Sequence, residues 1–297
     1  MENDTDLTTS PVESRIGVLN GMSVDVEDYY QTEAMTSAAP RSEWDKMPSR
    51  VVTNTERLFE LFAAHGVCAT FFFLGWVAER YPSLVRKAKD LGHEIGCHSY
   101  WHRPIFTLSR KEFREDTLRA KAAIEDATGS RILGYRAPSF SLTAGTEWAV
   151  DILGEAGFAY DSSIHPVAHD LYENRLAPRH PYQLAGTSLL EVPISTVRIG
   201  KTNLPFSGGG YFRMLPYRYV RWAMGRINRV EERPAVFYLH PWEIDATQPR
   251  LKAAWKSRFR QYTGLRKTQR LLERLLADFR FSRLDQIFLD AGFMSGR

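Results

Sequence analysis

The sequence predicts an α/β fold in which a largely parallel sheet curves into a barrel. Short apolar runs alternate with amphipathic stretches of helical length, the pattern expected of βαβ units. Six or seven such strands could close into a barrel or form an open sheet. Barrel closure is favoured because ionisable residues end five of the predicted strands, and such ends converge on one face of a barrel, where active sites are built. These residues are Asp25, His98, Arg136, Asp161 and His240.

The predicted strands are short, and each is rich in apolar or β-branched residues. The first begins the ordered part of the chain with IGVLNGMSVDVED. The second, CATFFFLG, is continuously apolar, so we expect it to be buried on both faces. We predict strands over residues 16–28, 68–75, 93–98, 131–136, 158–163, 188–195 and 235–240.

The predicted helices lie between these strands. Leu58, Leu61 and Phe62 have helical spacing in the first helix. Ser109 followed by Glu112 forms a capping box at the start of the longest helix, and Gly129 ends it. We predict helices over residues 53–65, 83–92, 109–128, 148–156 and 216–230.

We expect one barrel domain with flanking segments. Residues 1–15 read as a disordered tail, 16–248 as the barrel, and 249–297 as a basic helical extension packed on the barrel. Eleven Lys or Arg residues lie between positions 250 and 283, against only Glu273 and Asp278.

The extension carries an apolar stripe on a basic helix, formed by Leu265, Leu272, Leu276 and Phe279. We expect the stripe to pack on the barrel. The alternative is that it docks on anionic lipid and brings the protein to the inner face of the membrane.

Composition limits the class of protein. The 297 residues carry a net charge of +4, and 43% of them are hydrophobic, enough for a sizeable core. Two cysteines exclude a disulfide framework and a four-cysteine zinc module. The polar, acidic opening lacks the order of a secretory signal, and no apolar run approaches the roughly 20 residues of a membrane span. We therefore expect a cytoplasmic protein, and no familiar motif indicates nucleic-acid binding.

The stretch GCHSYWH holds two histidines four residues apart, His98 and His102. One turn at that spacing brings both rings to one side. Two imidazoles so placed can supply two corners of a zinc site, at about 2.0–2.1 Å from the ion. The stretch SVDVED offers the missing carboxylate. Strand alternation puts Asp25 and Glu27 on one face and Asp28 on the other.

These groups match the needs of metal-assisted hydrolysis. One carboxylate would bind the ion and a second would act as a base beside it. His240 in FYLHPWE would be the acid that protonates the leaving group. Asp161 would hold the His240 ring in the useful tautomer, and Arg136 would fix the base carboxylate by a bidentate pair.

With these motifs in view, the sequence resembles the NodB-type polysaccharide deacetylases, carbohydrate esterase family 4. The metal motif H-[ST]-x-x-H is matched at residues 98–102, and R-x-P-x-[FY] at residues 136–140. The acidic first motif, usually T-F-D-D, resembles residues 23–25 with the acids that follow. The fourth motif is represented only by residues 160–163, and L-x-H by Leu239-His240, shifted by one residue.

The resemblance implies a distorted (β/α)7 barrel, removal of N-acetyl groups, and Zn2+ or another divalent metal such as Co2+, Ni2+ or Mn2+ as cofactor. The resemblance also implies that Asp25 is the catalytic base. Because Val26 follows Asp25, the ligand role moves to Glu27 or Asp28; alternation favours Glu27, and a bulge or strand end would favour Asp28. Residues expected to contact the substrate are Pro138, Phe140, Gly209 and Trp242.

More narrowly, SVDVEDYY, FSGGGYFRMLP and YTGLRKTQRLLERLLADFRF resemble one branch of that family. Its members occur in exopolysaccharide loci linked to exosortase and PEP-CTERM systems, which implies a polysaccharide or lipid-linked precursor as substrate. The Gly208–Gly210 run either lies near the substrate or is a turn that needs positive φ. Two alternatives to a deacetylase stay open: an allantoinase-like cyclic-amide hydrolase and an inactive carbohydrate-binding module.

Overall fold

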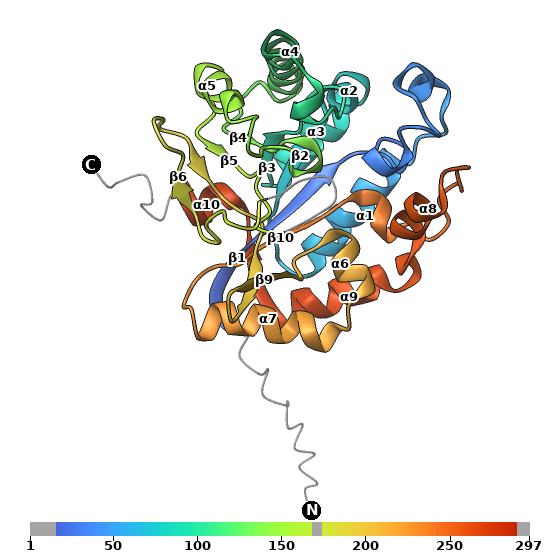
Figure 1. Cartoon of the computed structure of the whole chain (residues 1–297). Coiled ribbons are helices and arrows are strands. Elements are labelled where there is room, and N and C mark those ends of the chain that lie inside the picture. The colour runs from blue at the N-terminus through green and yellow to red at the C-terminus, as the bar shows by residue number, and fades with distance from the viewer. Residues whose placement is uncertain (1–15, 168–173, 290–297) are drawn as a thin grey trace, which may run out of the picture.

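The structure, a computed structural model, describes residues 16–167 and 174–289. Its centre is a curled sheet wrapped by helices (Figure 1). Seven strands run parallel in the order β10-β1-β2-β3-β4-β5-β7, and β6 adds an antiparallel edge. The strands of this sheet are β1 Ile16–Val26, β2 Thr70–Phe73, β3 Glu94–Cys97, β4 Gly134–Tyr135, β5 Tyr160–Asp161, β6 Tyr182–Gln183, β7 Leu190–Glu191, β10 Val236–Leu239 and β11 Phe279–Ser282. The predicted distorted (β/α)7 fold is confirmed.

The irregular backbone that follows β7 contacts β10 at the other end of the curled sheet. Ser195, which follows β7, donates its backbone N–H to the Val236 carbonyl at 3.2 Å, and its hydroxyl accepts the Val236 N–H at 2.7 Å. Gly208 forms an isolated parallel bridge with Tyr238. A separate hairpin, β8 Thr196–Ile199 with β9 Thr202–Pro205, lies between these two contacts. The barrel therefore closes through single contacts in place of a full strand ladder.

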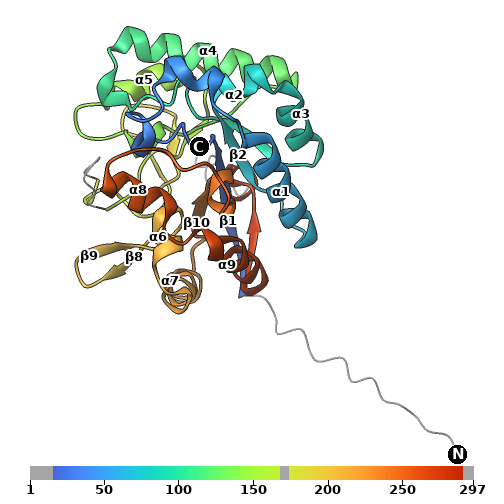
Figure 2. The same ribbon diagram turned by 90° about the vertical axis from the view of Figure 1, so that its right-hand side faces the viewer.

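Helices cover the outside of the sheet. Those between β2 and β5 gather on one side, and α7 and α9 lie together on another (Figures 1 and 2). The α-helices are α1 Val51–Ala64, α2 Gly75–Arg80, α3 Pro82–Asp90, α4 Arg110–Thr128, α5 Trp148–Glu155, α6 Gly209–Met214, α7 Tyr217–Arg229, α8 Trp255–Tyr262, α9 Leu265–Asp278 and α10 Leu284–Phe288. The 3-10 turns are η1 Glu33–Met35, η2 Arg41–Lys46, η3 Ile105–Thr107, η4 Pro138–Phe140 and η5 Pro241–Ile244. Among the described residues, no helix has both the length and the apolarity to cross a bilayer.

Strand β1 is the axis of the fold. Its second half pairs with β10 on one edge and β2 on the other, and its first half pairs with β11. Asp25 lies opposite Phe72, and Val24 opposite Leu239, so the polar end of β1 is held between apolar strands. Because β1, β3, β4, β5 and β10 are parallel, their carboxyl ends meet at one end of the sheet.

The predicted elements are present, with one correction in the basic C-terminal segment. The expected helix does not continue through Phe279, because α9 ends at Asp278 and the chain then forms β11 against β1. The segment therefore contributes a strand to the sheet. The apolar stripe is buried: Leu265, Leu272, Leu276 and Phe279 lie in the core, and none of them is available to a membrane.

Candidate active site

A cavity of about 370 Å³ lies at the carboxyl ends of the strands. Its walls come from the end of β1, the turns after β3, β4 and β10, and helices α6 and α8. Four of the five predicted strand-end residues contact this cavity or the groups that line it. The lining includes Asp25, Glu27, His98, His102, Phe140, Gly210, Tyr211, Arg213, Tyr238, His240, Trp242, Arg260 and Gln261.

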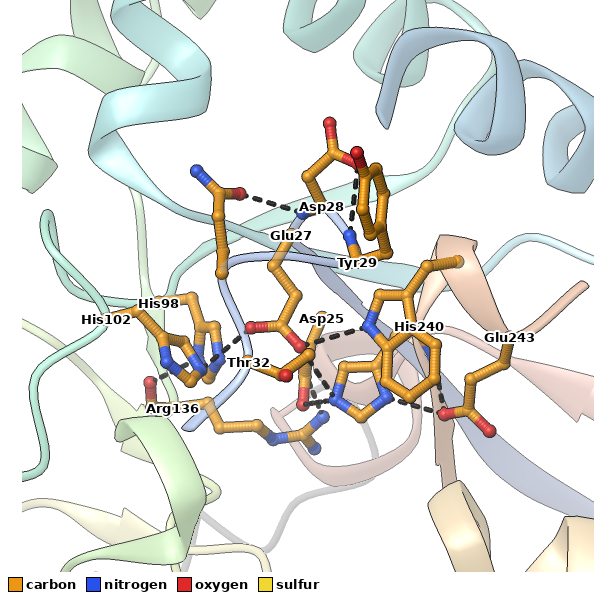
Figure 3. A network of polar contacts seen from close by, with 12 residues as sticks. Asp25, Glu27, Asp28, Tyr29, Thr32, His98, His102, Arg136, His240 and Glu243 are labelled. Carbon is orange, nitrogen blue, oxygen red and sulfur yellow. Dashed lines mark hydrogen bonds and ion pairs between the residues drawn. The ribbon is translucent and has the colours of Figure 1, made fainter. Parts of the chain in front are cut away.

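Three potential metal ligands converge within the cavity. One ligand atom from each of Glu27, His98 and His102 lies within 4.8 Å of the others, and all three side chains are buried. Nε2 of His102 is 2.8 Å from Oε2 of Glu27, and this oxygen accepts no hydrogen bond among the described residues. Figure 3 shows the three side chains pointing toward one another. A divalent ion would satisfy these converging donor atoms, so the residues fit a metal.

The charge states of these residues also suit a metal. Burial would raise the pKa of Glu27, but His102 and His240 outweigh it and lower the pKa to about 2. Burial lowers the pKa of His98 to about 4. Nδ1 of His98 lies 2.8 Å from the Arg136 carbonyl, which orients the ring and leaves Nε2 for the ion. At neutral pH the site therefore offers an ionised carboxylate and a neutral imidazole, as metal binding requires.

Backbone strain concentrates in the turns that carry these groups. Ser99 and His102 in the turn after β3, and Ser139 and Phe140 in η4, all have positive φ. The left-handed region is uncommon for residues other than glycine and persists where surrounding contacts enforce it. The described chain has only one other such residue, Glu232, so the strain is largely a property of the cavity walls.

Asp25 lies beside the metal-ligand cluster and is held by Arg136. Nη1 of Arg136 donates to Oδ1 of Asp25 at 2.7 Å, and both side chains are buried. The predicted bidentate pair is wrong, because the other guanidinium nitrogens bind elsewhere: Nε to the Ser162 carbonyl at 3.0 Å and Nη2 to the Ser162 hydroxyl at 2.8 Å. One contact holds Asp25 while the second oxygen, Oδ2, faces His240 at 3.9 Å.

His240 lies across the cavity from the two histidines, next to both acids (Figure 3). Its Nε2 is 3.5 Å from Oε1 of Glu27. Its Nδ1 is 2.5 Å from Oε1 of Glu243, whose other oxygen accepts from Nε of Arg213 at 2.8 Å. Burial would lower the pKa of His240, but Glu27, Glu243 and Asp25 raise it to about 9. The ring is therefore protonated at neutral pH and can act as a general acid.

The residue that orients His240 is Glu243, and the prediction that Asp161 does so is wrong. Asp161 ends β5 opposite Glu191 of β7, and Ser163 donates to its carboxylate at 2.5 Å. Ser163 in turn accepts the backbone N–H of Ala137 at 2.7 Å, so Asp161 supports the turn that begins with Arg136. Burial raises the pKa of Asp161 to about 6.

Asp28 lies outside the cluster, on the opposite side of the β1 end from Glu27. Its Oδ2 accepts from the Ser49 hydroxyl at 2.7 Å and from the backbone N–H groups of Arg50 and Val51 at 2.8 and 3.1 Å. These contacts hold the first residues of α1. Of the two acids left open by the sequence, the geometry brings Glu27 to the histidines and assigns Asp28 to the helix start.

The residues expected at the substrate lie at or just behind the cavity wall. Phe140 lines the cavity, and Pro138 precedes it in η4. Trp242 lines it too, and its indole N–H donates to Oε1 of Glu27 at 3.2 Å. Gly210 lines the cavity, whereas Gly208 and Gly209 have positive φ and pack against Tyr238. Gly208 and Gly209 thus need positive φ, and Gly210 is the member of the run at the cavity; contact of the run with a substrate stays a prediction.

Reasoning from the sequence missed three buried residues around His240. Glu243 and Arg213 are fully or nearly buried, and Tyr238 packs against Phe140 at a ring-centroid distance of 5.0 Å. Of these three, only Glu243 could have been predicted from the sequence, because it stands three residues after His240 in a capping-box arrangement.

The chain matches two family models. Residues 42–159 match "Polysaccharide deacetylase", and residues 162–289 match "Domain of unknown function (DUF3473)". A peptidoglycan deacetylase of Helicobacter pylori is 32% identical over 108 residues, which are 36% of this chain and 36% of that protein. A peptidoglycan-N-acetylglucosamine deacetylase of Bacillus cereus is 33% identical over 86 residues, 29% of each chain. The matched segments thus span about a third of these relatives.

A solved structure matches over almost the whole chain. It is the crystal structure of a protein from Mycobacterium smegmatis described as a candidate polysaccharide deacetylase, with 21% identity and a TM-score of 0.62. The alignment covers 97% of this chain and 94% of that one. At that identity the similarity establishes a shared fold.

Proposed function

We propose that this chain, whose residues 42–159 match the polysaccharide deacetylase family model, is a metal-dependent N-deacetylase. Its substrate would be an N-acetylhexosamine unit of a polysaccharide or of its lipid-linked precursor. The observation that carries the proposal is the convergence of Glu27, His98 and His102 beside two further groups, Asp25 and His240, able to accept and donate a proton.

Each of these residues has a chemical task in amide hydrolysis. Glu27, His98 and His102 would hold Zn2+ or a similar divalent ion, which when bound lowers the pKa of a coordinated water and polarises the amide carbonyl. Asp25, held through one oxygen by Arg136, would take the water proton on its other oxygen. His240, protonated and held by Glu243, would give its proton to the leaving sugar amine.

Arg136 and Glu243 keep the acid and base in place. Arg136 supplies the counter-charge to Asp25 in a buried site, and its other N–H groups donate to Ser162 and to the Ser23 hydroxyl. Glu243 is itself fixed by Arg213. Preorganised groups of this kind need no rearrangement when charge develops in the transition state.

The presence of both proton-transfer groups favours catalysis over the inactive carbohydrate-binding alternative. A binding module would need neither a base beside the metal ligands nor a partly buried histidine whose pKa is raised to about 9. The relatives' names support the substrate class: one acts on peptidoglycan N-acetylglucosamine, and another is a chitooligosaccharide deacetylase of Sinorhizobium fredii.

The finer assignment, a role in exopolysaccharide biosynthesis in the cytoplasm, rests on the motif resemblance of the sequence. Two structural facts agree with a reducing compartment: Cys68 and Cys97 are both free, and Cys97 is buried. The split into a barrel over residues 16–248 and an extension over 249–297 remains a prediction.

Acetate release from N-acetylglucosamine oligomers tests the proposal. We expect release that a chelator abolishes and that added Zn2+ or Co2+ restores. Assaying a cyclic amide such as allantoin in parallel separates the two enzyme classes. Hydrolysis of the cyclic amide without acetate release from the oligomers would contradict the proposed substrate.

A further inference from the structure

Helix α8 exposes two large aromatic side chains beside the active site. Trp255 is 73% exposed and Phe259 is 55% exposed. They stand four residues apart, so they share one face of the helix, and Arg258, three residues after Trp255, lies next to Trp255 at the edge of that face. Contiguous exposed apolar surface rimmed by polar residues is typical of sites that contact a partner.

The segment that carries these two residues is positively charged. Residues 246–272 contain eight Lys or Arg side chains and no Asp or Glu. Lys252, Lys256 and Arg258 are exposed, and none of them pairs with a carboxylate among the described residues. A surface that combines unpaired cations with exposed aromatic rings favours an anionic partner that can also accept apolar groups.

Helix α8 forms part of the rim of the catalytic cavity. Arg260 and Gln261, at its C-terminal end, line the cavity, and α8 packs against η1, whose Glu33 is also a lining residue. Met214 of α6, another lining residue, is 39% exposed on the same rim. In Figure 1, α8 lies at the periphery of the molecule, beyond α6 and α9.

We propose that α8 docks the protein on an anionic lipid bilayer, with Trp255 and Phe259 in the interface and Lys252, Lys256 and Arg258 against the headgroups. Aromatic side chains favour the bilayer interface, and basic residues near the surface are attracted to anionic lipids. Docking there turns the cavity rim toward the membrane, where a lipid-linked glycan would be presented. That last step rests on the proposed function; the docking itself does not.

An uncharged glycan explains the surface less well. Aromatic rings can stack on sugars, but a polymer of N-acetylhexosamines gives cations no counter-charge, and α8 offers no carboxylate to its hydroxyl groups. The positive charge of this face therefore favours an anionic bilayer over an uncharged glycan as the partner.

Vesicle flotation with the full chain tests the proposal. Vesicles of phosphatidylcholine alone are compared with vesicles that contain phosphatidylglycerol. We expect flotation only with the anionic vesicles, a fall of about tenfold or more in partitioning for W255A/F259A, and a similar fall for K256E/R258E. F106A removes an aromatic side chain that is 50% exposed on η3 and serves as the matched control; it should float like the unmodified protein.

Acetate release from a soluble oligomer is measured on the same samples. Trp255 and Phe259 lie outside the catalytic groups, so W255A/F259A should keep this activity. Absence of flotation with anionic vesicles, or equal flotation of W255A/F259A, overturns the proposal. A raised KM for soluble oligomer in W255A/F259A without a change in flotation makes α8 a glycan platform instead. If the unmodified chain does not bind vesicles and W255A/F259A loses self-association, α8 is a dimer contact instead. If no substrate releases acetate, the flotation result still stands by itself.

Discussion

Replacing Glu243 with Gln tests whether this residue sets the proton affinity of the catalytic acid. Glu243 is fully buried, with one oxygen 2.5 Å from Nδ1 of His240 and the other 2.8 Å from Nε of Arg213. A hydrogen bond to a charged group contributes about 1.5–3 kcal/mol. Since one pKa unit corresponds to about 1.4 kcal/mol, losing the charged partner should lower the pKa of His240 by about 1–2 units.

The assay is the pH dependence of kcat/KM for acetate release. Because His240 acts in its protonated form, its pKa sets the alkaline limb of the profile, and E243Q should move that limb to lower pH by about 1–2 units. Because Arg213 also loses its charged partner in E243Q, the folding of this variant is checked by thermal denaturation. E243D keeps the negative charge, so its alkaline limb should lie between those of E243Q and the unmodified protein. An alkaline limb at the same pH in E243Q and the unmodified protein would refute the role of Glu243.

Three further predictions concern the frame of the site. Gly208 has φ +118, and in G208A the new Cβ would lie 1.9 Å from the Tyr238 carbonyl oxygen, so we expect the unfolding free energy to fall by at least about 2 kcal/mol. Gly66 also has positive φ but no atom within 4 Å of an added Cβ, so G66A should cost only about 1–2 kcal/mol. Equal losses in the two variants would contradict the steric argument. D28A removes the acceptor of the Arg50 and Val51 backbone N–H groups at the start of α1 and should cost about 2–4 kcal/mol in urea denaturation. A loss below about 1 kcal/mol would show that water replaces the carboxylate. Burial and Asp285 raise the pKa of Glu94 to about 8, so the folded chain holds a proton that the unfolded chain releases near its ordinary value of 4.5. Stability from this group is complete below that value and is lost as pH rises toward 8; Tm should fall less over this range in E94Q, and parallel Tm profiles would contradict the shift.

The elements and the metal ligands could be predicted from the sequence because both depend on short-range patterns. The apolar run at β2 and the capping box at Ser109 are local signals, and both are observed. Strand alternation predicted Asp25 and Glu27 on one face, and both lie in the cavity, although β1 ends at Val26 and Glu27 is the first residue after it. Five strand ends could be expected to meet because parallel strands share one end of the sheet.

The pairing of side chains across that end could not be predicted in the same way. Asp161 ends β5 and His240 follows β10, but these strands lie at distant positions in the strand order, and the partner of the His240 ring comes from its own turn. Arg136 has several acceptors within reach, and which of them it uses depends on side-chain positions. The β11 strand was missed because the leucine spacing of α9 leads directly into Phe279, whose burial fits a helix or a strand equally well.

Metal content and turnover, measured on the same preparations of D25N and E27Q, test the central claim most directly. One divalent ion per chain is expected in the unmodified protein and in D25N, with acetate release in D25N reduced by at least about 100-fold because the base is lost. E27Q should lose the ion and the activity together. Full activity in D25N, or an ion retained in E27Q at the level of the unmodified protein, would contradict the assignment of base and ligand.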